Sequence, residues 1–121
     1  MGANGGWGDD INTLISQYKK IAAQTENFIA IIPHYGKDYT KEFEAAFGNK
    51  CVNMRAYANG SLFKDYDLEF TQVDKVDLEK GRLPRVFNWK RNKNDCHLNE
   101  LGYKILGDLV YKKGVELGYW K

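Results

Sequence analysis

The sequence contains few of the residues and runs that mark several common classes of protein. Its 121 residues include only two cysteines, Cys51 and Cys96, whose separation does not match the spacing of a zinc site or a redox pair. We therefore expect reduced thiols, with a disulfide between the two as the alternative. No apolar run approaches the ~20 residues that cross a bilayer, so no membrane span is predicted. The net charge of +2 is too small to predict a polyanionic partner, and nucleic acid is therefore not the expected ligand.

The N-terminus also lacks the charged and then apolar pattern of a signal peptide. A cytoplasmic location is the default expectation, and a secreted one would require a signal peptide ahead of Met1. No repeat or low-complexity linker divides the chain, and its length suits one domain. Residues 1–121 are therefore expected to belong to a single domain.

Apolar periodicity predicts an α/β fold. A first helix follows Asp9 or Asp10, and its apolar stripe consists of Ile11, Leu14, Ile15, Tyr18, Ile21 and Ala22. The apolar run at 27–32, ended by Pro33, is typical of a buried parallel strand. A second helix at 38–47 and a second short strand at 51–54 follow. A strand, helix and strand joined by short loops form a right-handed parallel unit, which indicates the α/β class.

The second half of the chain is less regular. Thr71 and Asp74 have the spacing of a capping box, which opens a short helix that is closed by Gly81 and carries Val73, Val76 and Leu78. Asn99 is a good N-cap for the last helix. The buried face of that helix is expected to contain Leu101, Ile105, Leu106, Leu109, Val110, Val115 and Leu117.

The polar turn before the last helix is the main candidate for chemistry. His97 lies at the start of this helix, and Asp95 precedes it by two residues. An imidazole can act as a general base when a neighbouring group holds its second ring nitrogen. The alternative is a histidine that caps the helix or lies on the surface. His34 follows the first strand, at the end where open α/β sheets bind ligands; it is either a substrate contact or a loop residue without a role.

The pattern around this turn resembles the closing motif of the SGNH (GDSL-type) ester hydrolases, Asp-x-His-Leu-Asn-x-x-Gly-Tyr at residues 95–103. Near the N-terminus, Gly2 and Asn4 form a Gly-x-Asn pair that is similar to the oxyanion motif of the same family. The resemblance implies a flavodoxin-like three-layer α/β/α sandwich with a parallel sheet. It implies hydrolysis of a small-molecule or acetylated-sugar ester without a metal or cofactor. His97 would be the general base, Asp95 would orient it, and Asn4 would donate to the oxyanion.

The chain departs from the family at the nucleophile and at the acid. The family's Gly-Asp-Ser loop has no counterpart, because Ser16 lies in the first helix and Ser61 follows an Asn-Gly turn. The chain therefore resembles a domain that lacks its N-terminal strands, and the serine is expected outside these 121 residues. The family's spacing is Asp-x-x-His, so Asn94, three residues before His97, is the alternative to Asp95.

Two further expectations follow from a partial domain. A sheet that lacks neighbouring strands leaves an open edge, so we expect a homo-oligomer in which the sheet continues between chains. The alternative function is a catalytically inactive module, derived from the hydrolase, that serves interaction or oligomerisation.

The region before the turn is rich in basic residues. It contains no acid between its first and last basic residue, and Phe87 and Trp89 are interleaved among Lys80, Arg82, Arg85, Lys90, Arg91 and Lys93. Such a pattern can bind nucleic acid, but a solvated loop with inward-packed aromatic residues is the favoured interpretation. A third interpretation is a loop that borders the substrate and prefers anionic or sugar ligands. A metal site is not predicted, because no pair among Cys51, Cys96, His34 and His97 has a suitable spacing.

Overall fold

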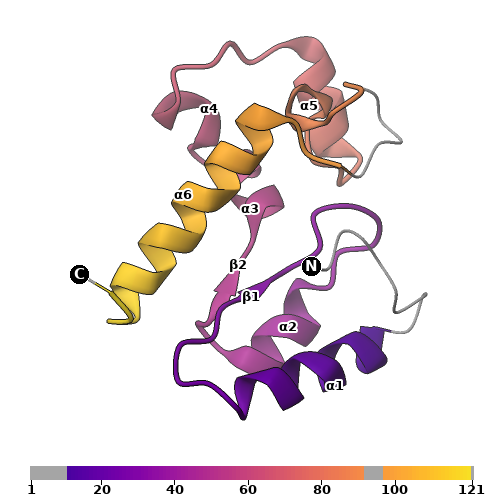
Figure 1. Ribbon diagram of the computed structural model, residues 1–121. Helices are drawn as coiled ribbons and strands as arrows, with labels where there is room; N and C mark the ends of the chain where they lie inside the picture. The colour runs from indigo at the N-terminus through magenta and orange to yellow at the C-terminus, as the bar shows by residue number, and fades with distance from the viewer. Residues whose placement is uncertain (1–10, 92–96, 121) are drawn as a thin grey trace.

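The structure, a computed structural model, describes residues 11–91 and 97–120 (Figure 1). Most of the described chain is helical, and its strands form one small parallel sheet. The elements are α1 (Ile11–Ala22), β1 (Ala30–Ile31), α2 (Thr40–Phe47), β2 (Cys51–Val52), α3 (Met54–Asn59), α4 (Leu62–Asp65), α5 (Gln72–Glu79), the 3₁₀ helix η2 (Arg85–Phe87) and α6 (Glu100–Glu116). This arrangement confirms the mixed α/β class.

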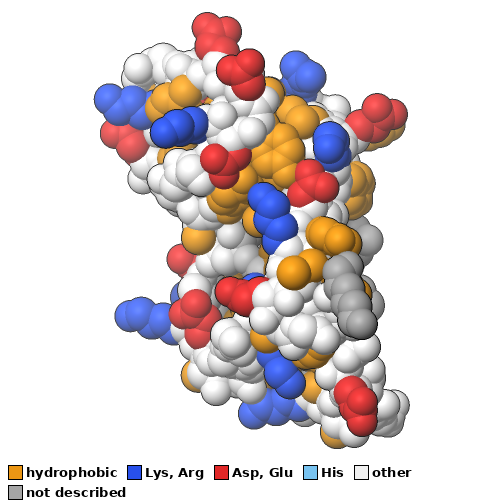
Figure 2. Space-filling view, turned by 90° about the vertical axis from the view of Figure 1, so that its left-hand side faces the viewer, with side chains coloured by type: hydrophobic (Ala, Val, Ile, Leu, Met, Phe, Trp, Pro, Cys, Tyr) orange, Lys and Arg blue, Asp and Glu red, His pale blue; other side chains and the backbone are white. Residues whose placement is uncertain are grey.

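The surface carries charges of both signs. Figure 2 shows Lys and Arg side chains interspersed with Asp and Glu side chains over one face, with hydrophobic side chains gathered in its upper half. None of the described helices combines the length and the hydropathy that a bilayer-spanning helix requires.

The sheet consists of β1 and β2, which pair in parallel with Ala30 opposite Cys51 and Ile31 opposite Val52. The N–H of Ala30 donates to the carbonyl of Lys50 at 2.7 Å. Both predicted strands are present, but the regular ladder is shorter than the apolar runs at 27–32 and 51–54. The second strand ends early because the side chain of Asn53 accepts a hydrogen bond from the N–H of Ala56 and so starts α3 at Met54.

One hydrophobic cluster, which we call the first cluster, packs α1 and α2 against β1. Its buried members are Leu14, Ile15, Tyr18, Phe28, Ala30, Ile32 and Phe43. The ring of Tyr18 meets the rings of Phe28 and Phe43 edge-on, with centroid distances of 6.2 and 5.9 Å. The predicted stripe of α1 is confirmed at its buried positions, whereas Ile21 at the end of the stripe is 44% exposed.

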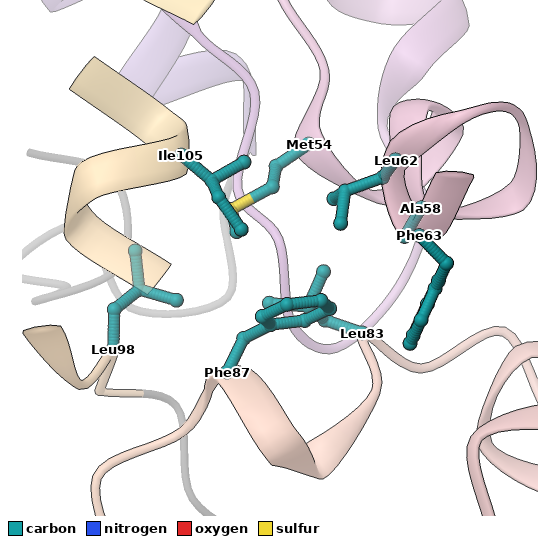
Figure 3. Packing of buried hydrophobic residues seen from close by; sticks show 8 residues of the cluster. All are labelled: Met54, Ala58, Leu62, Phe63, Leu83, Phe87, Leu98 and Ile105. Carbon is teal, nitrogen blue, oxygen red and sulfur yellow. The ribbon is translucent and has the colours of Figure 1, made fainter. Parts of the chain in front are cut away.

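The second cluster is built from α3, α4, η2 and α6 (Figure 3). Its buried members are Met54, Ala58, Leu62, Phe63, Leu83, Phe87, Leu98 and Ile105. The α6 helix connects the two clusters, because it packs against both η2 and β2 and runs from the upper to the lower part of Figure 1. Beyond α6, the hydroxyl of Tyr119 donates to the carbonyl of Phe28 at 2.9 Å.

The α5 helix buries carboxylates. The predicted capping box of Thr71 and Asp74 is confirmed, since each residue bonds the other's backbone. The buried side chains of α5 are Asp74 and Asp77, while Val73 is 47% exposed. Asp77 has no exposed surface and accepts hydrogen bonds from Arg82 and Arg85. The capping box therefore identified the helix, but its predicted apolar residues are not the side chains that attach it to the rest of the molecule.

Arg55, in α3, fixes the loop that follows β1. It is 7% exposed, and its guanidinium donates to four carbonyl oxygens, those of Pro33, Gly36, Lys37 and Gly81, at 2.6–3.1 Å. One buried cation thus joins the end of β1 to the C-terminal end of α5.

Candidate active-site turn

The turn that carries His97 is part of a short antiparallel ribbon. Asn88 forms an isolated antiparallel bridge with Leu98. On one side of this bridge the N–H of Trp89 donates to the carbonyl of His97 at 2.8 Å, and on the other the N–H of Asn99 donates to the carbonyl of Phe87 at 2.9 Å. This register places Trp89 directly opposite His97, where cross-strand side chains on the same face are neighbours.

Leu98 and Asn99 anchor the turn. Leu98 is 3% exposed and packs in the second cluster. The side-chain oxygen of Asn99 accepts from the N–H of Gly102 at 2.9 Å and caps α6, as predicted. Its amide nitrogen donates to the carbonyls of Val86 and Asn88 at 2.8 and 3.0 Å. The Asn99 side chain therefore joins the start of α6 to the opposing strand.

Gly102 allows α6 to approach that strand. A Cβ atom at this position would lie 2.5 Å from the carbonyl oxygen of Phe87 and 3.0 Å from the Cβ of Leu98. Both distances are below or at the limit of real Cβ contacts, so only glycine fits without displacement. The Leu-Asn-x-x-Gly part of the motif thus has a structural cause that is independent of catalysis.

His97 itself is exposed on this fixed backbone. Beside the turn lies an open hollow of about 450 Å³, lined by Trp89, Arg91, Asn99, Glu100 and Leu101. The combination of a held main chain and an accessible ring suits a group that exchanges protons with a ligand.

The other predicted site residues lie outside the described residues. These are Asp95 and Asn94, the two alternatives for orienting His97, and Gly2 and Asn4 of the predicted oxyanion loop. The structure therefore places the predicted base but not its predicted partners. Cys96 also lies outside the described residues.

Neither serine is arranged as a nucleophile. Ser16 is exposed on α1. The hydroxyl of Ser61 donates to the carboxylate of Asp65 at 2.8 Å, and the hydroxyl of Tyr57 donates to the same carboxylate at 2.6 Å. These two hydrogen bonds, from Tyr57 first and then from Ser61, lower the pKa of Asp65. A carboxylate with a lowered pKa is a poor base at neutral pH, so it does not activate Ser61.

His34 is buried at 5% exposure, at the end of β1, and its ring meets that of Tyr35 with a centroid distance of 5.9 Å. It follows the strand as predicted, but its side chain lies inside the fold rather than on the loop surface. A direct contact with substrate is therefore not supported by its position.

Two of the basic residues before the turn form ion pairs with the single carboxylate of Asp77, which accepts from Arg82 at 3.1 Å and from Arg85 at 2.9 Å. The favoured expectation of inward aromatic residues is correct for Phe87, which is fully buried, and wrong for Trp89, which is 69% exposed. Sequence reasoning missed the roles of Asp77 and Arg55. The available signal for Asp77 was a carboxylate on a short helix followed five and eight residues later by arginines.

Metal ligands do not gather in the described part of the chain, where no group of three or more His, Cys, Asp or Glu side chains is placed to hold an ion.

The thiol of Cys51 donates to the carbonyl of Phe43 at 3.5 Å. Burial and the charge of Glu44 raise its pKa to about 11, against a smaller opposite effect of Lys113. This thiol therefore stays protonated at neutral pH and is unreactive.

The chain matches no family model, no curated protein and no solved structure.

Proposed function

We propose that this chain carries the histidine-bearing part of an ester hydrolase site of the SGNH type. His97 is the general base in this proposal, Asp95 or Asn94 orients its ring, and Asn4 donates to the oxyanion. The nucleophilic serine lies outside the 121 residues. The single observation that supports the proposal most is the exposed His97 ring on a turn that Leu98, Asn99 and Gly102 fix against the second cluster.

The proposed chemistry is that of a serine esterase. His97 takes the hydroxyl proton as the serine oxygen attacks the ester carbonyl, and it returns the proton to the departing alcohol as the ester C–O bond breaks. Water then attacks the acyl-serine by the same route, which releases the acid and the free serine. The substrate is a small-molecule or acetylated-sugar ester.

The proposed fold is a three-layer α/β/α sandwich. The parallel pair β1–β2 would form part of a larger parallel sheet, and this is consistent with the observation that two-stranded sheets alone are marginal. The fixed ends of the strands and the His97 turn would then border one site.

The first test uses the 121-residue chain with a serine-directed fluorophosphonate, followed by intact-mass measurement. We expect no adduct, because Ser16 lies on an exposed helix face and Ser61 is bonded to Asp65. A stoichiometric adduct on either serine would contradict a nucleophile outside the chain.

The second test uses the product of any open reading frame that continues in frame ahead of Met1. For that protein we expect hydrolysis of p-nitrophenyl acetate, and we expect His97→Ala to lower kcat/KM by about 10³-fold or more. Lys75→Ala, a change of an exposed α5 residue that does not line the hollow beside the turn, is the control. Retained turnover in His97→Ala would refute its role.

An inactive interaction module is the second candidate function. It is favoured by the apolar groove beside β1, which has a volume of about 310 Å³ and is lined in part by Tyr18, Ile21, Phe28 and Ile31. If the extended protein has no esterase activity but self-associates through this groove, the module is the better description.

A further inference from the structure

We propose that the hollow beside His97 binds an acidic sugar, whose ring stacks on Trp89 and whose anionic group binds Arg91. This inference names the substrate class of the proposed esterase. It rests on the proposed function only where the sugar is taken as a substrate, because binding of the sugar can be measured without turnover.

Trp89 is the ring platform of the proposed site. At 69% exposure it is the most exposed large hydrophobic side chain among the described residues. Its backbone is nevertheless fixed, because its N–H donates to the carbonyl of His97. Binding of a ligand over this exposed indole lowers the free energy, because it removes apolar surface from water. The C–H face of a pyranose ring is suited to stack on the indole in this way.

Arg91 is the arginine that the fold leaves available. The sequence has four arginines. Arg55 is saturated by carbonyl oxygens, and Arg82 and Arg85 bind Asp77. Among the described residues, the guanidinium of Arg91 has no carboxylate partner. A planar guanidinium binds a carboxylate in bidentate fashion, which makes an anionic group its natural ligand.

The backbone of Arg91 is also unusual. Its φ is 50°, in the left-handed region that a side-chain-bearing residue rarely adopts, and its N–H donates to the carbonyl of Asn88 at 3.2 Å. Such strain concentrates at ligand-binding positions. The tight turn places Arg91 on the wall of the hollow together with Trp89.

Glu100, the other charged group of the hollow, favours a sugar over a polyanion. Glu100 lines the same hollow and can accept hydrogen bonds from hydroxyl groups, whereas it repels a second negative charge. Glu69 and Asp74 line the adjoining cavity of about 350 Å³, which Arg91 also borders. Binding of a nucleic acid requires several free cationic side chains along the phosphate backbone, whereas this surface carries acidic side chains beside Arg91. A ligand with one sugar ring and one anionic group therefore matches the side chains that line the hollow.

The test is calorimetric titration of the 121-residue chain with methyl galacturonoside, which has one ring and one carboxylate, and with its methyl ester, which has the same ring but no charge. We expect the acid to bind about 10-fold or more tightly than the ester at low salt. Arg91→Ala should remove this preference, and Trp89→Ala should weaken both ligands. Lys75→Ala removes an exposed charge outside the hollow and should change neither affinity.

Several outcomes would overturn the proposal. These are no binding of the acid, equal binding of acid and ester, or a wild-type preference that survives in Arg91→Ala. Tighter binding of single-stranded oligothymidylate than of the acid would assign the site to nucleic acid instead. His97→Ala separates this inference from the proposed function, because it should retain acid binding. An extended protein that binds the acid without hydrolysing esters would refute the esterase and leave the binding site in place.

Discussion

Asp77 is a buried carboxylate whose charge is balanced by the side chains of Arg82 and Arg85 and by the backbone N–H of Arg85. Burial on its own raises the pKa of Asp77, but the hydrogen bonds from Arg85 and Arg82 and the charge of Arg85 outweigh burial and lower it. The carboxylate therefore remains ionised, and its loss leaves two arginines without their partner.

We expect Asp77→Ala to lower the free energy of unfolding by about 2–3 kcal/mol, less than for a fully buried pair because the arginines are 30% exposed. A lowered pKa means that the stabilisation is present above the ordinary value of 3.8 and is lost as the pH falls through the folded-state pKa. Urea unfolding of the wild type and the variant at pH 7 and pH 3 measures both effects. A difference in stability that grows as the pH falls would contradict this assignment.

Tyr57 provides the corresponding test at alkaline pH. Burial, the hydrogen bond to Asp65 and the charges of Asp65 and Asp108 raise its pKa to about 12. A raised pKa contributes stability that is complete below the ordinary value of 10 and is lost as the pH rises towards 12. The stability difference between the wild type and Tyr57→Phe should therefore shrink between these values. The pKa of Tyr66 is also raised, so tyrosinate absorbance should show one fewer late-ionising phenol in the variant than in the wild type.

Gly102 and Gly107 lie in the same helix, α6, and differ in what surrounds them. Alanine has a higher helix propensity than glycine by about 1 kcal/mol. A Cβ at Gly102 meets the carbonyl oxygen of Phe87 at 2.5 Å, whereas a Cβ at Gly107 meets nothing within 4 Å. We expect Gly102→Ala to destabilise the fold by about 2 kcal/mol and Gly107→Ala to stabilise it by about 0.5–1 kcal/mol. Guanidinium unfolding of the two variants measures both signs, and equal effects would show that the contact with Phe87 is unimportant.

The elements that the sequence predicts well are those set by local signals. Asn99 and Thr71 start their helices as capping rules predict, and the stripe of α1 is buried at Leu14, Ile15 and Tyr18. Short strands and short helices were predicted less well, because Asn53 ends β2 and starts α3 through one hydrogen bond. The candidate site depends on contacts between residues that lie further apart in the sequence. The pairing of Trp89 with His97 arises from a single bridge, which leaves no period in the sequence.

At the scale of the whole molecule, the open edge of β1 predicts self-association. The N–H groups of Ala30 and Ile32 face β2, so Ile29 and Ile31 direct theirs to the other edge, where the described chain offers no further strand. The groove along this edge has no charged side chain in its lining. A second copy that presents the same edge about a two-fold axis would satisfy both sets of backbone groups.

We expect light scattering to show a dimer whose population rises with concentration. Ile21→Lys places a charge on the wall of this groove and should shift the chain to monomer. Val73→Lys is the matched control, because Val73 is similarly exposed, at 47% against 44% for Ile21, and lies on α5 away from the groove. A wild-type monomer at all concentrations, or equal effects of the two variants, would exclude this interface.

The two clusters occupy successive stretches of the chain, residues 14–43 and 54–105. A ribosome therefore releases every buried member of the first cluster before it has made the second. The first cluster can pack while the later residues are still being added, since all of its hydrophobic side chains come from residues 11–51. Leu98 and Ile105 are the last core residues to emerge, and they position the His97 turn. The candidate base thus reaches its final place only when synthesis of the core is complete, so premature termination before Ile105 would leave the first cluster formed and the turn without its support.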